Sequence, residues 1–193
     1  MSDILNYVVL NYNCLIKDGY VIFPIKIANC NVSDIINNIS NNLNNIYGKA
    51  GNLNAIIDKI TIDVDLLFYF DIDLFLIQFT GTSPKYEKFL KKIKSSRLFY
   101  DTKDSFKIKE LSHGMSGGNC YGDEPTRFDE NLEIGSIINN KIKDVNKLFK
   151  TNISELKYNI SYETDDEYYG NFYTYLIIEF DKLYLFNKCK DVL

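Results

Sequence analysis

The order in which strand-type and helix-type patterns follow one another constrains the fold of this chain most. Segments with apolar residues at alternate positions occur in clusters along the 193 residues, with a few helix-type segments between the clusters. A regular alternation of strands and helices would predict a parallel sheet, whereas clustered strands favour an antiparallel one. We therefore expect an α+β fold with a largely antiparallel sheet and about three amphipathic helices. The length fits a single globular domain over 1–193, with 1–100 and 101–193 as candidate substructures.

The predicted strands are rich in β-branched and aromatic residues, or alternate between apolar and polar residues. They cover Asn6–Ile16, Tyr20–Ala28, Ile60–Leu66, Asp71–Leu74, Phe106–Leu111, Leu156–Tyr162, Phe172–Phe180 and Leu183–Phe186. The turn signal K-D-G joins the first two strands in a hairpin, and the acidic segment T-D-D-E-Y-Y-G-N joins two of the last three. No good turn signal divides residues 60–79, so a helix stays open there as the alternative to two strands.

The predicted helices show apolar residues at the 3.6-residue spacing of an amphipathic helix. Their boundaries are caps and breakers: Ser33 before Ile35–Tyr47, Gly48 and Gly51 after it, Ser83 and Pro84 at the start of the second helix, and Ser136 before Ile137–Phe149. The outer face of the first helix is almost entirely Asn, a mediocre helix former. This helix must therefore depend on packing of its apolar face.

Charge and composition exclude several classes of protein. The chain carries 26 acidic and 22 basic residues, a net charge of -4, whereas general nucleic-acid binding needs a basic surface. The apolar run from Ile60 to Phe79 contains four aspartates, which argues against a membrane span. The N-terminus lacks the pattern of a signal peptide. We therefore expect a cytoplasmic protein, in the host cytoplasm if its source is viral.

The four cysteines are widely spaced and form no C-x-x-C pair. They are Cys14, Cys30, Cys120 and Cys189, and in a reducing cytoplasm we expect them to be free thiols. The chain has neither a Walker loop nor a G-x-G-x-x-G segment, which disfavours a nucleotide or dinucleotide cofactor. We expect no cofactor of any kind.

The segment from Ser112 to Asp129, S-H-G-M-S-G-G-N-C-Y-G-D-E-P-T-R-F-D, gathers the only histidine, one cysteine and four glycines. A nucleophilic cysteine needs a thiolate, and therefore a nearby base or cation. Cys120, His113 and Asp123 would form such a Cys-His-acid set, beside glycine amides that could bind an oxyanion. The corresponding enzyme is a cysteine-dependent hydrolase or acyltransferase.

The same segment also has a simpler interpretation as a rigid turn, because Gly and Pro followed by acidic residues build turns. The acidic residues directly after Cys120 would raise the pKa of its thiol and oppose catalysis. Fragments of motifs often match by chance. The sequence therefore leans toward a protein that is not an enzyme, without deciding the question.

Two groups of residues resemble metal ligands, and we predict a metal at neither. His113, Cys120, Asp123 and Glu124 lack the paired C-x-x-C or H-x-x-x-H spacing of a zinc site. The segments 63–65 and 71–73 read D-V-D and D-I-D, like the D-x-D that holds a divalent ion with a nucleotide sugar. Aspartates at alternate positions on the wet face of a half-buried strand explain these segments more simply.

The segment from Lys85 to Arg97 carries six basic residues and one acidic residue. Lys88 and Lys92 are its candidate binding residues, for phosphate or for an acidic protein surface. A solvated helix face is the alternative, and we favour it. Contact with nucleic acid is therefore not expected except through this helix.

Two short segments together resemble a group of small uncharacterised proteins of bacteria and their phages. Residues 117–124 read G-G-N-C-Y-G-D-E, similar to a G-G-N-C-W-G-[DN]-E segment, and residues 167–175 read E-Y-Y-G-N-F-Y-T-Y, similar to E-Y-Y-G-N-Y-T-x-Y. Tyr121 stands where that group has Trp. The resemblance covers the C-terminal half and implies no activity. It implies a phage or mobile-element setting, which agrees with the abundance of residues that have AT-rich codons.

The resemblance also implies that the two aromatic-bearing segments pack together. Tyr121, Tyr168, Tyr169 and Tyr173 would then form one surface or one core, and tyrosine clusters are enriched at protein interfaces. The sequence thus predicts a non-enzymatic protein-interaction factor, for example an inhibitor of a host defence system or a virion-associated protein. The alternative is the thiol enzyme built on Cys120 and His113.

Overall fold

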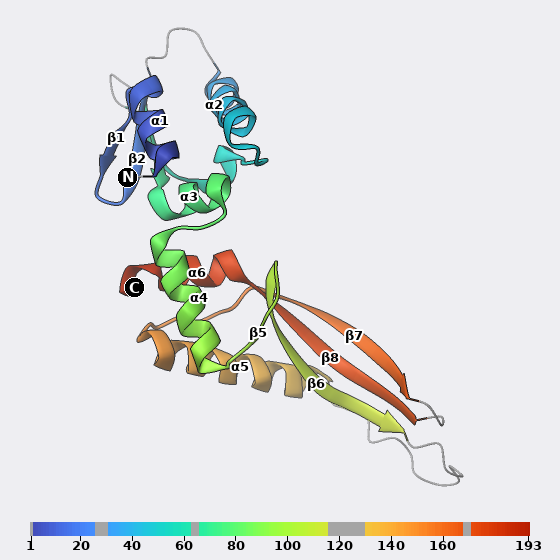
Figure 1. Cartoon of the computed structure of the whole chain (residues 1–193). Coiled ribbons are helices and arrows are strands. Elements are labelled where there is room, and N and C mark those ends of the chain that lie inside the picture. The colour runs from blue at the N-terminus through green and yellow to red at the C-terminus, as the bar shows by residue number, and fades with distance from the viewer. Residues whose placement is uncertain (1, 26–30, 63–65, 116–129, 168–170) are drawn as a thin grey trace. The chain divides into compact units, whose positions relative to one another are not determined.

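The computed structural model describes residues 2–25, 31–62, 66–115, 130–167 and 171–193 (Figure 1). The chain divides into two compact units, Met1–Glu87 and Lys88–Leu193. Each unit has its own four-stranded antiparallel sheet together with helices. The predicted α+β class with antiparallel sheets is confirmed, while the single-domain organisation stays a prediction. Among the described residues, no helix combines the length and the apolar character that crossing a membrane requires.

Unit 1 contains a sheet in the order β1-β2-β4-β3, in which every neighbouring pair is antiparallel. Its elements are α1 (Asp3–Tyr12), β1 (Leu15–Lys17), β2 (Tyr20–Ile25), α2 (Val32–Tyr47), the 3₁₀ turn η1 (Leu53–Ile56), β3 (Ile57–Ile62), β4 (Leu66–Asp71) and α3 (Ile72–Thr80). Buried phenylalanines form the centre of its core, with the rings of Phe23 and Phe70 edge to face at 5.4 Å. Helix α4 (Pro84–Ser96) contains the boundary between the units.

The strand predicted over Asn6–Ile16 is wrong, because this region is mostly helix α1, followed by the short β1. The buried residues Ile4, Leu5 and Val8 follow helical spacing. Ile4 and Leu5 lie before Asn6, outside the segment whose alternating apolar residues suggested a strand, so the helical spacing was not recognised.

Residues 60–79 contain both of the predicted alternatives, since β3 and β4 are followed by helix α3. The strand predicted over Asp71–Leu74 is wrong because Asp71 caps this helix. Its carboxylate accepts hydrogen bonds from the amides of Asp73 at 3.1 Å and Leu74 at 3.0 Å. Such side-chain bonds satisfy amides that have no partner within a helix.

Helix α2 begins one residue before the predicted cap, and Asn31 replaces Ser33 as the N-cap. The helix ends at Gly48, which adopts the left-handed conformation expected of a C-cap glycine. Not all of its asparagines are solvated. The Asn44 side chain accepts a hydrogen bond from the amide of Gly51 at 2.6 Å and donates one to its carbonyl at 3.0 Å.

Unit 2 is built on a sheet in the order β5-β6-β8-β7, again antiparallel throughout. Its elements after α4 are β5 (Tyr100–Asp101), β6 (Ser105–Met115), α5 (Glu130–Phe149), β7 (Tyr158–Glu167), β8 (Asn171–Asp181), α6 (Lys182–Cys189) and the 3₁₀ turn η2 (Lys190–Val192). Strands β6, β8 and β7 form a long ribbon in which β7 is the strand at one edge of the sheet (Figure 1).

The core of unit 2 is centred on Phe89 of α4. Its ring lies 5.4 Å from that of Phe149, 5.6 Å from that of Phe186 and 5.8 Å from that of Phe106. The second predicted helix, with Phe89 on its apolar face, is therefore confirmed. Aromatic packing of this kind fixes α4, α5 and α6 against β6.

Several predicted boundaries in unit 2 need correction. The strand predicted over Leu183–Phe186 is wrong, since Asp181 accepts a hydrogen bond from the amide of Tyr184 at 2.9 Å and caps helix α6. Helix α5 begins at Glu130 and not near Ser136. The acidic residues assigned to a turn after Tyr162 belong instead to β7, which extends to Glu167.

The sheet of unit 2 has one apolar and one mostly polar face, because side chains alternate between the two faces of a strand. Phe106 lies opposite Phe180, and Ile108 lies opposite Ile178, all four of them buried. On the other face the side chain of Lys107 forms an ion pair with Glu179. The side chain of Lys107 also donates a hydrogen bond to Glu179, and this bond raises the pKa of Lys107.

Candidate functional site

The predicted thiol site lies largely outside the described residues. Cys120, Asp123 and Glu124 belong to segment 116–129, of which the structure gives no description. His113 belongs to β6, where it lies opposite Thr174 next to a register shift. Neither the catalytic interpretation nor the turn interpretation of this segment is therefore tested.

The two cysteines that the structure describes lie in the protein interior. Cys14 and Cys189 are free thiols and are buried. Burial raises the pKa of each thiol to about 12, and in Cys189 this effect exceeds the opposing influence of Lys92. Because the thiolate is the reactive form, this raised pKa lowers the reactivity of both thiols near neutral pH.

The carboxylates singled out in the sequence do not form a metal site where they are described. Asp71 caps α3, and Asp73 in the first turn of that helix lies 3.8 Å from the ammonium of Lys85. Asp63 and Asp65 lie outside the described residues. Within the described ranges, no group of three or more His, Cys, Asp or Glu residues is arranged to hold a metal ion.

The tyrosines predicted to form one surface are only partly described. Tyr121, Tyr168 and Tyr169 lie outside the described residues. Tyr173 belongs to β8, opposite Gly114 of β6 and Asp165 of β7. Strand β6 leads toward segment 117–124, and strands β7 and β8 contain or adjoin segment 167–175. These three strands are neighbours in one sheet.

The basic residues of α4 differ in their exposure. Lys88 is exposed, whereas Lys92 is partly buried and its ammonium lies 4.8 Å from the ring centroid of Phe149. A cation over an aromatic ring gains some stability and is less available to a partner. Lys92 thus contributes to the packing of unit 2, and Lys88 is the more accessible of the two predicted contacts.

A different surface, the outer edge of β7, was not predicted as a site. The side chains of Tyr158, Ile160 and Tyr162 continue the apolar face of the sheet, opposite the buried Phe180, Ile178 and Leu176 of β8. They are nevertheless 39%, 40% and 46% exposed. The core of unit 2 therefore ends in a row of partly uncovered apolar side chains.

The backbone of β7 also presents its hydrogen-bonding groups on this side. The amide of Asp181 donates to the carbonyl of Lys157 at 3.0 Å, and the register continues from there without a shift. Hydrogen-bonded and non-hydrogen-bonded pairs alternate along an antiparallel ladder. Asn159 and Ser161 therefore direct their N–H and C=O groups toward β8, whereas Tyr158 and Ile160 direct theirs outward. No strand among the described residues pairs with this outer edge.

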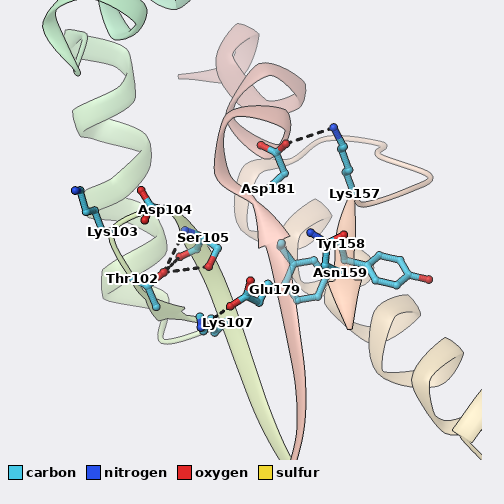
Figure 2. Close-up of a pocket in the computed structure, with 11 residues that line it drawn as sticks. Thr102, Lys103, Asp104, Ser105, Lys107, Lys157, Tyr158, Asn159, Glu179 and Asp181 are labelled. Atoms are coloured by element: carbon cyan, nitrogen blue, oxygen red, sulfur yellow. Dashed lines mark hydrogen bonds and ion pairs between the residues drawn. The ribbon is translucent and has the colours of Figure 1, made fainter. Parts of the chain in front are cut away.

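An open groove with a volume of about 620 Å³ lies at the base of the same sheet, on its polar face (Figure 2). The turn residues Thr102–Ser105 line one side, and Lys157–Asn159 line the other. Figure 2 shows two ion pairs here, Lys107 with Glu179 and Lys157 with Asp181, the latter at 3.7 Å. The charges of these residues are largely compensated, so the groove has no strong preference for a cation or an anion.

A buried lysine holds the base of the sheet together. Lys182, at the start of α6, forms an ion pair with Asp101 and donates a hydrogen bond to the carbonyl of Thr102. Its ammonium lies 5.0 Å from the ring centroid of Phe106. Only 7% of Lys182 is exposed, and a buried ammonium needs such partners. This contact fixes the β5–β6 turn against the end of β8.

The segment that leads into β7 is fixed from helix α5. The Asn146 side chain accepts a hydrogen bond from the amide of Ile153 at 2.7 Å and donates one to the carbonyl of the same residue at 2.9 Å. The side chains of Ile153 and of Leu156, three residues further along the chain, are both buried. The start of β7 is therefore held in place, so its outer edge is a well-positioned surface.

No known family model matches this chain, and neither a curated protein nor a solved structure shows significant similarity to it.

Proposed function

We propose that this chain is a non-enzymatic protein-interaction factor that binds a protein partner at the outer edge of β7. The observation that carries the proposal is the combination of outward backbone groups with the partly exposed side chains of Tyr158, Ile160 and Tyr162. A partner strand added at such an edge gains affinity from main-chain hydrogen bonds and specificity from alternate side chains. Exposed edge strands otherwise promote aggregation, and proteins usually cover them.

A phage or mobile-element accessory protein is the setting that we propose for this interaction. It is supported by the family-like segments 117–124 and 167–175 and by the AT-rich codons of the abundant residues. An inhibitor of a host defence system and a virion-associated protein both fit a small acidic protein with many tyrosines. On this proposal, Cys120→Ser leaves partner binding intact, whereas Tyr158→Ala or Tyr162→Ala weakens it.

Site-specific photo-crosslinking in the producing cells tests this function. A photoreactive residue in place of Tyr162 is expected to form a covalent adduct with a protein, and Ile160→Pro in the same chain is expected to abolish it. The matched control places the photoreactive residue at Leu111, which is 55% exposed on the polar face of β6. The proposal fails if Tyr162 gives no adduct beyond that seen at Leu111.

A further inference from the structure

We infer that the partner at the outer edge of β7 is a second copy of this chain. The inference rests on the proposed function, because it assigns an occupant to the same edge. The two β7 strands run antiparallel about a two-fold axis through the position of Ile160. The two sheets of unit 2 then become one continuous eight-stranded sheet, with β7 and β7 of the second copy at its centre.

The apolar residues of β7 are self-complementary in this register. Ile160 lies opposite Ile160 of the second copy, and Tyr158 lies opposite Tyr162 in both directions. All of these side chains occupy the same face of the sheet, since opposed residues of an antiparallel pair point to the same side. The row of partly exposed side chains in each copy is thereby covered by the row of the other.

The charges on the opposite face agree with the same register. Lys157 lies opposite Glu163 of the second copy, and Asn159 lies opposite Ser161. Lys157 is 70% exposed at its side chain and Glu163 is 58% exposed, so both are accessible despite their contacts with Asp181 and Lys109. Each dimer gains two such opposite-charge pairs, one at each end of the apolar row.

Other registers fit the sequence less well. A shift of two residues in one direction places Tyr158 opposite Thr164, and a shift in the other direction leaves only residues 158–160 of each β7 paired. Parallel pairing in register places Glu163 beside Glu163. Like charges directly opposite each other destabilise a sheet, which disfavours the parallel pairing. The register centred on Ile160 is favoured over the two shifted ones because it alone places Tyr158 opposite Tyr162 and Lys157 opposite Glu163.

The backbone directions derived for β7 suit this pairing. Tyr158 and Ile160 direct their N–H and C=O groups outward, and the pairs centred on Ile160 are therefore hydrogen-bonded pairs. The apolar half of β7, residues 158–162, contains no charged residue. Charged side chains and proline are common means of keeping an edge strand unpaired. The other half of β7 carries four acidic residues, so the pairing that we infer is confined to residues 157–163.

Sedimentation velocity across a wide concentration range, combined with a charge-swapped mixture, tests this dimer. The wild-type protein is expected to sediment as a dimer, and Ile160→Pro as a folded monomer. Lys157→Glu alone and Glu163→Lys alone are each expected to raise the dimer dissociation constant about tenfold or more. An equimolar mixture of these two variants restores the dimer, because every opposed pair then carries opposite charges.

The controls and the contradicting results are specific. Circular dichroism and thermal unfolding confirm that each variant is folded, and the mixture makes the test independent of Ile160→Pro. A mixture that remains as weak as its two components overturns the register centred on Ile160. A wild-type monomer at every concentration, with a photo-adduct to a different protein at Tyr162, overturns the second copy but leaves the proposed function standing. A monomer with no adduct rejects both.

Discussion

Two neighbouring proline substitutions in β7 are expected to differ strongly in their effect on stability. The amide of Ser161 is directed toward β8, opposite Ile177, whereas the amide of Ile160 is directed to the open edge. Proline has no amide hydrogen, so it removes a ladder hydrogen bond only where the amide faces the neighbouring strand. Ser161→Pro should therefore be far more damaging than Ile160→Pro, although the two residues are adjacent.

The magnitude follows from the burial of the two sites. Ile160 is 40% exposed, so its burial contributes about 1–2 kcal/mol, and the proline ring keeps part of it. Ile160→Pro should then lower the free energy of unfolding of the monomer by about 1 kcal/mol. Ser161→Pro removes the bond to the Ile177 carbonyl and inserts a ring facing β8, a loss of about 3 kcal/mol or more.

Urea unfolding followed by far-ultraviolet circular dichroism measures both values. The comparison must be made at a concentration at which both variants are monomeric, because self-association adds apparent stability. We expect a difference of about 2 kcal/mol between the two variants, with similar m-values. Equal destabilisation by the two prolines would refute the assignment of the outward direction to Ile160, and with it the basis for pairing at this edge.

Further predictions concern the supports of the fold and the buried thiols. Asp101→Asn should lower the free energy of unfolding by about 1–2 kcal/mol, since a partly exposed charged partner of Lys182 is lost. In a Lys182→Met background the same change should alter the free energy of unfolding by less than about 0.5 kcal/mol. A double-mutant cycle measured by urea unfolding tests this difference. Gly51→Ala should cost about 1–3 kcal/mol in thermal unfolding because the added Cβ overlaps a buried aromatic ring. Cys14 and Cys189 should resist iodoacetamide in the native protein at pH 8. Their folded pKa of about 12 exceeds the ordinary 9.0, so the stability due to protonated thiols is complete below pH 9.0 and is lost as the pH rises toward 12. Fast native-state alkylation would contradict the burial of these thiols.

The fold class could be predicted from the sequence because it depends on the number and clustering of periodic segments. The helix around Phe89 and the strand containing Phe106 were predictable in the same way, since their apolar positions follow one clear period. The helices α1, α3 and α6 were not, because short apolar segments fit both periods. In α3 and α6 an aspartate, Asp71 or Asp181, decides for the helix by capping it, and this signal is present in the sequence.

The candidate site was less accessible to prediction than the fold. The alternation of Tyr158, Ile160 and Tyr162 predicts a strand, but it does not reveal that this strand is an edge. That depends on the order β5-β6-β8-β7, which is set by contacts distant in sequence. The only hint of this edge in the sequence is that residues 158–162, between Lys157 and Glu163, carry no charge. The catalytic role considered for the segment around Cys120 stays a prediction, because this segment lies outside the described residues.

Hydrogen exchange of the β7 amides, measured residue by residue with NMR as the protein concentration is raised, tests the central claim most directly. The amides of Asn159 and Ser161 should exchange slowly at every concentration, since they face β8. The amides of Tyr158 and Ile160 should exchange rapidly in dilute solution and slowly once the edge is paired. Rapid exchange at Ile160 at every concentration and in every complex formed would contradict the claim that proteins bind at this edge.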